Sequence, residues 1–132
     1  MAKLVCKLIG VVFILVGVVG FVIPGFLGTH LSLAHNAVHL ISGAIALYFG
    51  FAGSPSAART FCLAFGAVYL LLGVVGFVMG APGASTITGM MMEDSKMWKV
   101  IPGTLELGKM DHIVHCLPGV VFLAGGLLGG RD

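Results

Sequence analysis

A duplicated hydrophobic segment is the feature of this chain that most limits its fold. The segment LVGVVGFV at residues 15–22 recurs as LLGVVGFV at residues 71–78. A second pair follows, with HNAVH at residues 35–39 and DHIVH at residues 111–115. Because an internal repeat fixes the architecture before any local assignment, the sequence predicts two tandem helical hairpins. They cover residues 1–52 and 57–132, and we expect pseudo-two-fold symmetry between them.

The composition places these hairpins in a membrane. Hydrophobic residues make up 58% of the 132 residues and charged residues only 9%, whereas a soluble domain has about 25% charged residues. A helix that crosses a bilayer needs about 20 mostly apolar residues. We therefore expect an all-α integral membrane protein with four transmembrane helices. The predicted spans are Leu4–Ile23, Ala34–Ala52, Thr60–Met79 and Ile113–Gly130.

The distribution of charge gives an orientation. Lys3 and Lys7 precede the first span as they would in a secretory leader, but the repeat of this span as the third one indicates a retained helix. Lys3, Lys7, Arg59 and Arg131 all lie on one predicted side, and the positive-inside rule makes that side cytoplasmic. Both termini are then cytoplasmic. The net charge is only +2 and no Lys/Arg run is present, so nothing favours a nucleic-acid partner.

Glycines repeat together with the hydrophobic segment. Lipid gives helices no hydrophobic drive to associate, so small residues that let backbones approach closely take over that role. We expect the repeated glycines to form helix-packing faces inside the bundle, although such faces also suit contact with another protein. They are Gly10, Gly17 and Gly20 in the first span and Gly66, Gly73 and Gly76 in the third.

The connection over residues 80–110 is longer than most loops, and loops of this length are often functional. We expect it on the extracytoplasmic side, with part of it lying on the bilayer surface. Trp98 stands between Lys96 and Lys99, a setting typical of an interfacial anchor. Because thioethers are soft ligands, Met90–Met92 and Met97 also allow a copper(I) site.

The histidines are the candidate functional residues, and all five lie on the predicted side away from the termini. His35 and His39 are four residues apart and His112 and His115 three apart, so each pair shares one helical face. Ser32 or Asn36 is expected to cap the second span and Asp111 the fourth. His39 and His115 lie about 6–9 Å below the helix starts, at about 1.5 Å per residue. At that depth they are expected to face the bundle interior.

Three interpretations of these histidines remain open. In the first, His39 and His115 donate hydrogen bonds to carbonyls of neighbouring helices and hold the hairpins together. In the second, they bind a cofactor, as axial ligands of a haem or a chlorophyll-type pigment. In the third, the outer residues His30, His35 and His112 join them in a divalent-metal site. Catalytic motifs are lacking, so we do not expect an enzyme.

Several short motifs carry a resemblance to a family of small bacterial membrane proteins known only as a four-helix domain of unknown function. The motifs begin at Asn36 (N-x-x-H), Ala58 (A-R-x-F), Gly66 (G-x-x-Y) and Asp111 (D-x-x-x-H). The resemblance covers about residues 33–123 and implies four spans in a bacterial inner membrane. It pairs His39 with His115, and it implies no activity.

These observations favour a non-catalytic accessory or structural subunit of a larger membrane assembly, or a homo-oligomer in the lipid bilayer. In the cofactor interpretation, such a subunit binds haem or (bacterio)chlorophyll through His39 and His115. The alternative is a stand-alone small transporter or metal-handling protein that uses the outer histidines.

Overall fold

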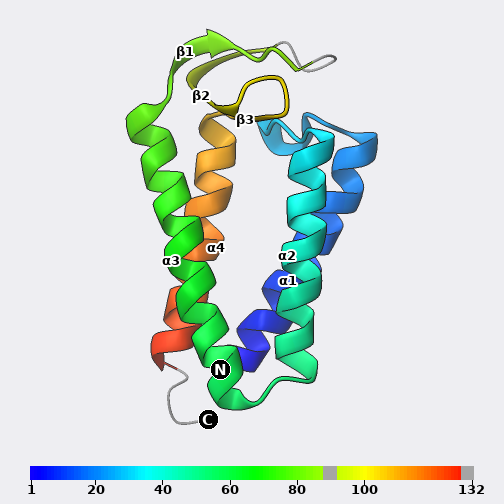
Figure 1. Ribbon diagram of the computed structural model, residues 1–132, viewed down its shortest axis with the longest axis vertical. Helices are drawn as coiled ribbons and strands as arrows, with labels where there is room; N and C mark the ends of the chain where they lie inside the picture. The colour runs from blue at the N-terminus through cyan, green and yellow to red at the C-terminus, as the bar shows by residue number, and fades with distance from the viewer. Residues whose placement is uncertain (88–91, 129–132) are drawn as a thin grey trace.

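Two helical hairpins stand side by side, and a small sheet covers one end of the bundle (Figure 1). The computed structural model describes residues 1–87 and 92–128. The helices are α1 (Ala2–Val22), α2 (Leu33–Phe51), α3 (Pro55–Met79) and α4 (Lys109–Leu128), with a 3-10 turn η1 (Phe26–Gly28) after α1. The strands are β1 (Ala81–Ala84), β2 (Glu93–Ile101) and β3 (Leu105–Leu107). In this part of the chain, 4 helices are long and apolar enough to cross a membrane, which indicates a multi-pass membrane protein.

The helix starts follow from local capping. The Ser32 hydroxyl accepts a hydrogen bond from the His35 amide at 3.2 Å, which confirms the expected cap of α2. Ser54 caps α3 in the same way, through the Ala57 amide. The prediction that Asp111 caps α4 is wrong, because α4 begins at Lys109. Its first amide donates instead to Asp94 of β2, at 2.8 Å.

Close glycine contacts join the two helices of each hairpin, and the contacts of one hairpin repeat in the other. A Cβ atom added to Gly10 would lie 2.8 Å from Leu47 Cγ, and one added to Gly66 would lie 2.7 Å from Leu123 Cγ. The remaining matched contacts are Gly17 with Leu40, Gly73 with Cys116, Gly20 with Asn36 and Gly76 with His112. The repeated glycines therefore lie where α1 meets α2 and where α3 meets α4.

The all-α prediction is wrong for the connection between α3 and α4, which forms a three-stranded antiparallel sheet in the order β1-β2-β3. Ala81 lies opposite Met97, and Trp98 lies opposite Leu107. Within β2, the side chain of Met97 is buried, whereas those of Lys96 and Trp98 beside it are partly exposed. A reading for hydrophobic spans does not detect so short a pattern. Trp98 lies half-buried on β2, and its role as an interfacial anchor stays a prediction.

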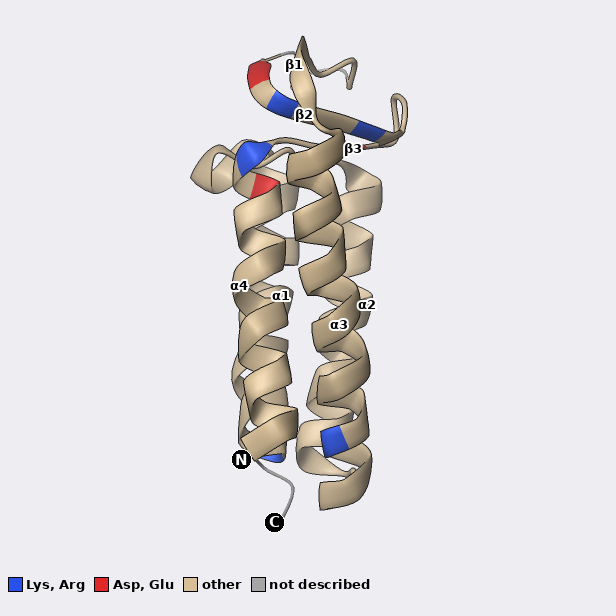
Figure 2. Ribbon diagram, turned by 90° about the vertical axis from the view of Figure 1, so that its left-hand side faces the viewer, with Lys and Arg blue, Asp and Glu red and all other residues tan. Residues whose placement is uncertain are grey.

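The ends of the bundle differ. The N-terminus, the α2–α3 turn and the last residues of α4 lie at the end opposite the sheet (Figure 1). Lys, Arg, Asp and Glu residues are confined to the two ends in the view of Figure 2, and the helices between them show none. This arrangement suits a bundle whose middle is surrounded by lipid.

An aromatic core fills the bundle on the side of the α2–α3 turn. Phe61 stacks on Phe65 with ring centroids 4.2 Å apart and meets Phe122 edge-on at 5.6 Å. Phe13 continues this core towards the sheet, 5.1 Å from the ring of Tyr69. The apolar packing stops there, and polar side chains fill the bundle between this core and the sheet.

The glycine contacts can be tested at Gly73. A Cβ atom there would lie 2.7 Å from the carbonyl oxygen of His112 and would also meet Cys116. Gly73→Ala should destabilise the protein by about 1–3 kcal/mol through overpacking, despite the helix propensity gained by Ala. Thermal unfolding in detergent measures this effect. Gly83→Ala is the control, because a Cβ atom at Gly83 meets nothing within 4 Å. Equal melting of Gly73→Ala and the wild type would contradict the packing role.

Candidate metal centre

Three buried histidines from two helices meet just beneath the sheet. His35 and His39 come from the first two turns of α2, and His115 comes from α4 in the other hairpin. Their exposed fractions are 2%, 1% and 3%. One ring nitrogen from each lies within 4.8 Å of the others. A tetrahedral ion bound at 2.0–2.1 Å needs nitrogens about 3.3 Å apart, so small ring rotations would bring these three to metal-binding distance.

The hydrogen bonds of His35 fix which of its nitrogens is available. Its Nδ1 lies 2.9 Å from the carbonyl oxygen of His30. A carbonyl only accepts, so Nδ1 must carry the proton and donate. The lone pair is then on Nε2, which is buried and has no hydrogen-bond partner within the described protein. A backbone contact of this kind is the usual support for a metal-binding histidine.

The other two rings also have nitrogens without partners. Neither nitrogen of His39 has a hydrogen-bond partner among the described residues, and Nδ1 of His115 has none. The interpretation in which both rings donate to carbonyls of neighbouring helices is therefore wrong for His39. An unsatisfied polar group in an apolar interior costs about 1–3 kcal/mol, so these rings need another role to explain their position.

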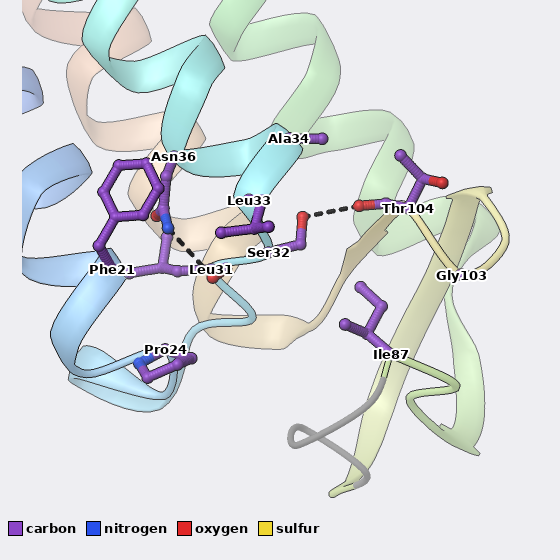
Figure 3. Close-up of a pocket in the computed structure, with 11 residues that line it drawn as sticks. Phe21, Pro24, Leu31, Ser32, Leu33, Ala34, Asn36, Ile87, Gly103 and Thr104 are labelled. Carbon is purple, nitrogen blue, oxygen red and sulfur yellow. Dashed lines mark hydrogen bonds between the residues drawn. The ribbon is translucent and has the colours of Figure 1, made fainter.

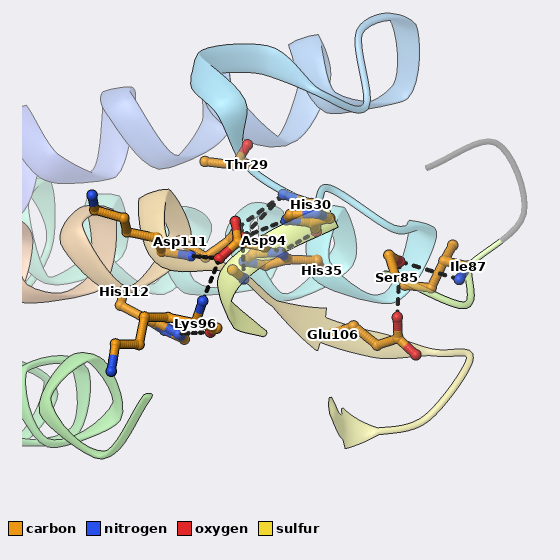
Figure 4. A network of polar contacts seen from close by, with 12 residues as sticks. Thr29, His30, His35, Ser85, Ile87, Asp94, Lys96, Glu106, Asp111 and His112 are labelled. Atoms are coloured by element: carbon orange, nitrogen blue, oxygen red, sulfur yellow. Dashed lines mark hydrogen bonds and ion pairs between the residues drawn. The ribbon is translucent and has the colours of Figure 1, made fainter. Parts of the chain in front are cut away.

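A buried carboxylate stands behind the histidine cluster. Asp111, in the first turn of α4, accepts hydrogen bonds from the amides of His30 at 3.1 Å and Gly108 at 2.8 Å. It also accepts one from His30 Nδ1 at 3.2 Å, and its other oxygen lies 3.7 Å from His35 Nδ1. The bond to Asp111 raises the pKa of the His30 imidazole, although burial opposes the shift. Figure 4 shows His30 and His35 gathered around this carboxylate.

The remaining two sequence candidates, His30 and His112, lie outside the cluster. His112 Nε2 donates to the carbonyl oxygen of Lys96 at 2.8 Å and so joins α4 to β2. Its ring packs against Gly76 and lies 5.3 Å from the ring of Phe77. His30 bonds to Asp111 instead of facing the three clustered rings. His30 therefore supports the site through Asp111, whereas His112 joins α4 to β2, and neither residue belongs to the ligand set.

The floor of the cluster is aromatic. The ring of Phe13 lies 5.5 Å from that of His39, and the ring of Tyr69 lies 5.7 Å from that of His115. The Tyr69 hydroxyl donates to Ser42 at 2.9 Å, so it has a partner of its own. These contacts leave the three rings bounded by aromatic side chains on the side away from the sheet.

The sheet is held over the site by a second buried carboxylate, Glu106 of β3. Its oxygens accept hydrogen bonds from the amides of Thr86 at 2.7 Å and Gly103 at 2.9 Å. The hydroxyls of Ser85 and Thr86 also donate to it. Burial alone would raise the pKa of this carboxyl, but these bonds lower it to about 2. Sequence reasoning missed Glu106 because its partners come from separate loops.

A cavity of about 410 Å³ lies between the end of α1, the start of α2 and the sheet loops (Figure 3). Ser32 donates to the carbonyl oxygen of Thr104 across it at 2.6 Å. Asn36 is fully buried beside it and packs against Gly20. None of the clustered histidines lines this cavity.

The copper(I) hypothesis rests partly on residues 90 and 91, which lie outside the described residues. Of the other methionines in that hypothesis, Met92 is exposed and Met97 is buried on β2. The copper(I) site therefore stays a prediction.

Residues 25–128 match the family described as a domain of unknown function (DUF4383), and the chain belongs to this family. No curated protein and no solved structure matches it. The motif residues recognised in the sequence have defined places in the fold. Arg59 donates to the carbonyl oxygen of Gly126 at 2.9 Å, Tyr69 bonds to Ser42, and His39 and His115 belong to the cluster.

The role of Glu106 predicts how the sheet responds to acid. A carboxyl with a lowered folded-state pKa stabilises the fold above its unfolded pKa, and this contribution is lost as the pH falls towards about 2. Glu106→Gln should remove this part of the acid transition and destabilise the sheet already at neutral pH, by about 1–3 kcal/mol. The fluorescence of Trp98, the single tryptophan, reports the transition.

Glu93→Gln on exposed β2 is the matched control for this experiment, because it removes the same charge from the same sheet. Its acid transition should follow that of the wild type, since Glu106 and its four donors are unchanged in this variant. Identical transitions for Glu106→Gln and Glu93→Gln would rule out the proposed role of Glu106.

Proposed function

We propose that this chain is a membrane protein that binds one divalent transition-metal ion through His35, His39 and His115. The observation that carries the proposal is the meeting of three buried imidazoles from both hairpins within 4.8 Å. Several nitrogens of these rings have no hydrogen-bond partner among the described residues, and coordination of an ion would satisfy them. The proposed activity is binding and not catalysis.

The donor set indicates the class of ion. Three imidazoles suit Zn²⁺, Cu²⁺, Ni²⁺ or Co²⁺, whereas Mg²⁺ and Ca²⁺ prefer oxygen ligands. His35 gains its correct tautomer from the carbonyl of His30, and Asp111 supplies a negative charge 3.7 Å from the same ring. Such outer contacts typically change metal affinity by about 10–100-fold. The carbonyl of His30 and the carboxylate of Asp111 are therefore part of the proposed site.

The packing around the rings favours an ion over a macrocycle. His39 is in ring contact with Phe13 and with His35, and His115 is in ring contact with Tyr69. The cavity beside His35 and His115 has a volume of about 190 Å³, below the roughly 300–1,000 Å³ of pockets that hold drug-sized ligands. A haem or a chlorophyll-type pigment on His39 or His115 would require these helices to separate.

The setting of the protein is part of the same proposal. We place the chain in the bacterial inner membrane with both termini cytoplasmic. Lys3 and Lys7 lie in the first two turns of α1 and Arg59 in the second turn of α3, and both helices start at the end opposite the sheet (Figure 1). The two hairpins are related by a pseudo-two-fold axis, which the matched glycine contacts support. We further propose that the chain acts as an accessory subunit of a larger membrane assembly or as a homo-oligomer. Co-purification of a fixed set of partners in mild detergent tests that role.

Metal binding makes a direct prediction for the ligands. After treatment with a chelator, the full chain in detergent should bind one Co²⁺ or Zn²⁺ per molecule. His39→Ala or His115→Ala should weaken binding by at least about 100-fold, since loss of a ligand exceeds loss of an outer contact. Calorimetry and metal analysis measure both quantities. His112→Gln is the control, because it removes an imidazole outside the cluster and keeps an amide donor for the Lys96 carbonyl. Unchanged affinity in His39→Ala would contradict the proposal.

A second prediction separates a ligand from a structural histidine. His39 has no hydrogen-bond partner among the residues that the structure describes, so metal-free His39→Leu should melt at the same temperature as the metal-free wild type or higher. Metal at about 100 times the wild-type dissociation constant should stabilise the wild type by about 2.7 kcal/mol and the variant, with its at least 100-fold weaker binding, by no more than about 0.4 kcal/mol. A large loss of stability in metal-free His39→Leu would instead support a structural role.

A further inference from the structure

A small cavity joins the histidine cluster to the lipid-facing surface. It has a volume of about 190 Å³ and lies between α2 and α3, which belong to different hairpins and contact each other much less than the helices within a hairpin do. His35 and His115 line it, together with Ser42 and Tyr69. Val38 and Val68 also line it and are 44% and 58% exposed. The cavity therefore opens between valines that face the membrane.

The proposed ion would have an unfilled coordination position beside this cavity. A tetrahedral ion takes four ligands, and sites with three protein ligands keep the fourth for a small molecule. No fourth His, Cys, Asp or Glu joins the group within the described residues. His35 and His115 border the cavity, whereas His39 does not. The open position accordingly faces the cavity between α2 and α3.

Charge and polarity define what fits there. A divalent ion with three neutral imidazoles carries two positive charges, and the nearest buried carboxylate, Asp111, offsets one of them. An anionic oxygen would neutralise the remaining positive charge and fill the fourth coordination position. The mouth between Val38 and Val68 admits molecules dissolved in lipid, and the volume accommodates only a head group and its first carbons. The rest of the molecule would remain among the lipid tails.

From this geometry we propose that the site binds the carboxylate of a long-chain fatty acid, which enters from the membrane between α2 and α3. The carboxylate oxygen occupies the fourth position on the ion, and the apolar chain leaves past Val38 and Val68. This inference rests on the proposed metal site and adds its ligand class and its route of entry.

The test uses the full chain loaded with Co²⁺ in a detergent without carboxylates, because the visible spectrum of Co²⁺ reports its coordination. Decanoate should change the spectrum at a concentration about 10-fold lower than acetate, since the cavity buries part of the apolar chain. Decanol, which lacks the charge, should have little effect. An equal response to acetate would show a site open to water, and an equal response to decanol would show that charge is not recognised. Either result overturns the proposal.

Two variants locate the route of entry. Val68→Trp fills the mouth of the cavity and should weaken the decanoate response at least 10-fold while Co²⁺ affinity stays within a factor of two. Val74→Trp is the matched control on α3, because Val74 is 48% exposed and does not line the cavity. Val38→Trp tests the opposite rim if Val68→Trp does not fold. A decanoate response that survives both rim variants would contradict the route.

The outcomes also separate this inference from the function on which it rests. If the wild-type protein binds Co²⁺ but shows the same spectrum with and without decanoate, the proposed metal site stands and the proposed fatty-acid ligand is wrong. If the wild-type protein binds no Co²⁺, both the proposed metal site and the proposed fatty-acid ligand are wrong.

Discussion

A buried imidazole nitrogen needs a partner, and each of the five histidines in the upper half of this bundle has a buried nitrogen without one among the described residues. Three of these rings lie together. His35, His39 and His115 are almost fully buried, in a chain with only 9% charged residues. Leucine at these positions would pack without any polar deficit. The cluster instead gathers nitrogens from both hairpins and surrounds them with aromatic rings and a carboxylate. The ion that we propose would account for these costs.

The fold serves this cluster at three levels. Glycine contacts bring α1 against α2, which carries His35 and His39, and α3 against α4, which carries His115. This close packing holds the histidines of each hairpin in place. The carbonyl of His30 fixes the tautomer and orientation of His35, and the Asp111 carboxylate lies 3.7 Å from the same ring. The sheet closes the end of the bundle, and buried Glu106 holds its loops together through four donors. The site therefore depends on residues from both hairpins and from the sheet.

The repeat and the hydrophobic runs were sufficient to predict four helices and their approximate bounds, because both signals extend over many residues. The sheet over residues 81–107 was missed, since its strands are short and their pairing is set by contacts distant in sequence. Three of the five histidines gather, and no spacing rule could identify which ones. His112 shares a helical face with His115, yet it bonds to the Lys96 carbonyl because β2 lies above it. Glu106 gave no sequence signal, since a lone Glu in a loop is usually exposed.

X-ray absorption at the zinc edge of the Zn²⁺-loaded protein tests the central claim most directly. Three imidazole nitrogens and one oxygen donor should scatter at about 2.0–2.1 Å, with no sulfur in the first shell. A sulfur shell at about 2.3 Å would place the ion on Cys6 and Cys62, whose Sγ atoms lie 3.5 Å apart. A shell of oxygens without imidazole scattering would show that the three histidines do not hold the ion.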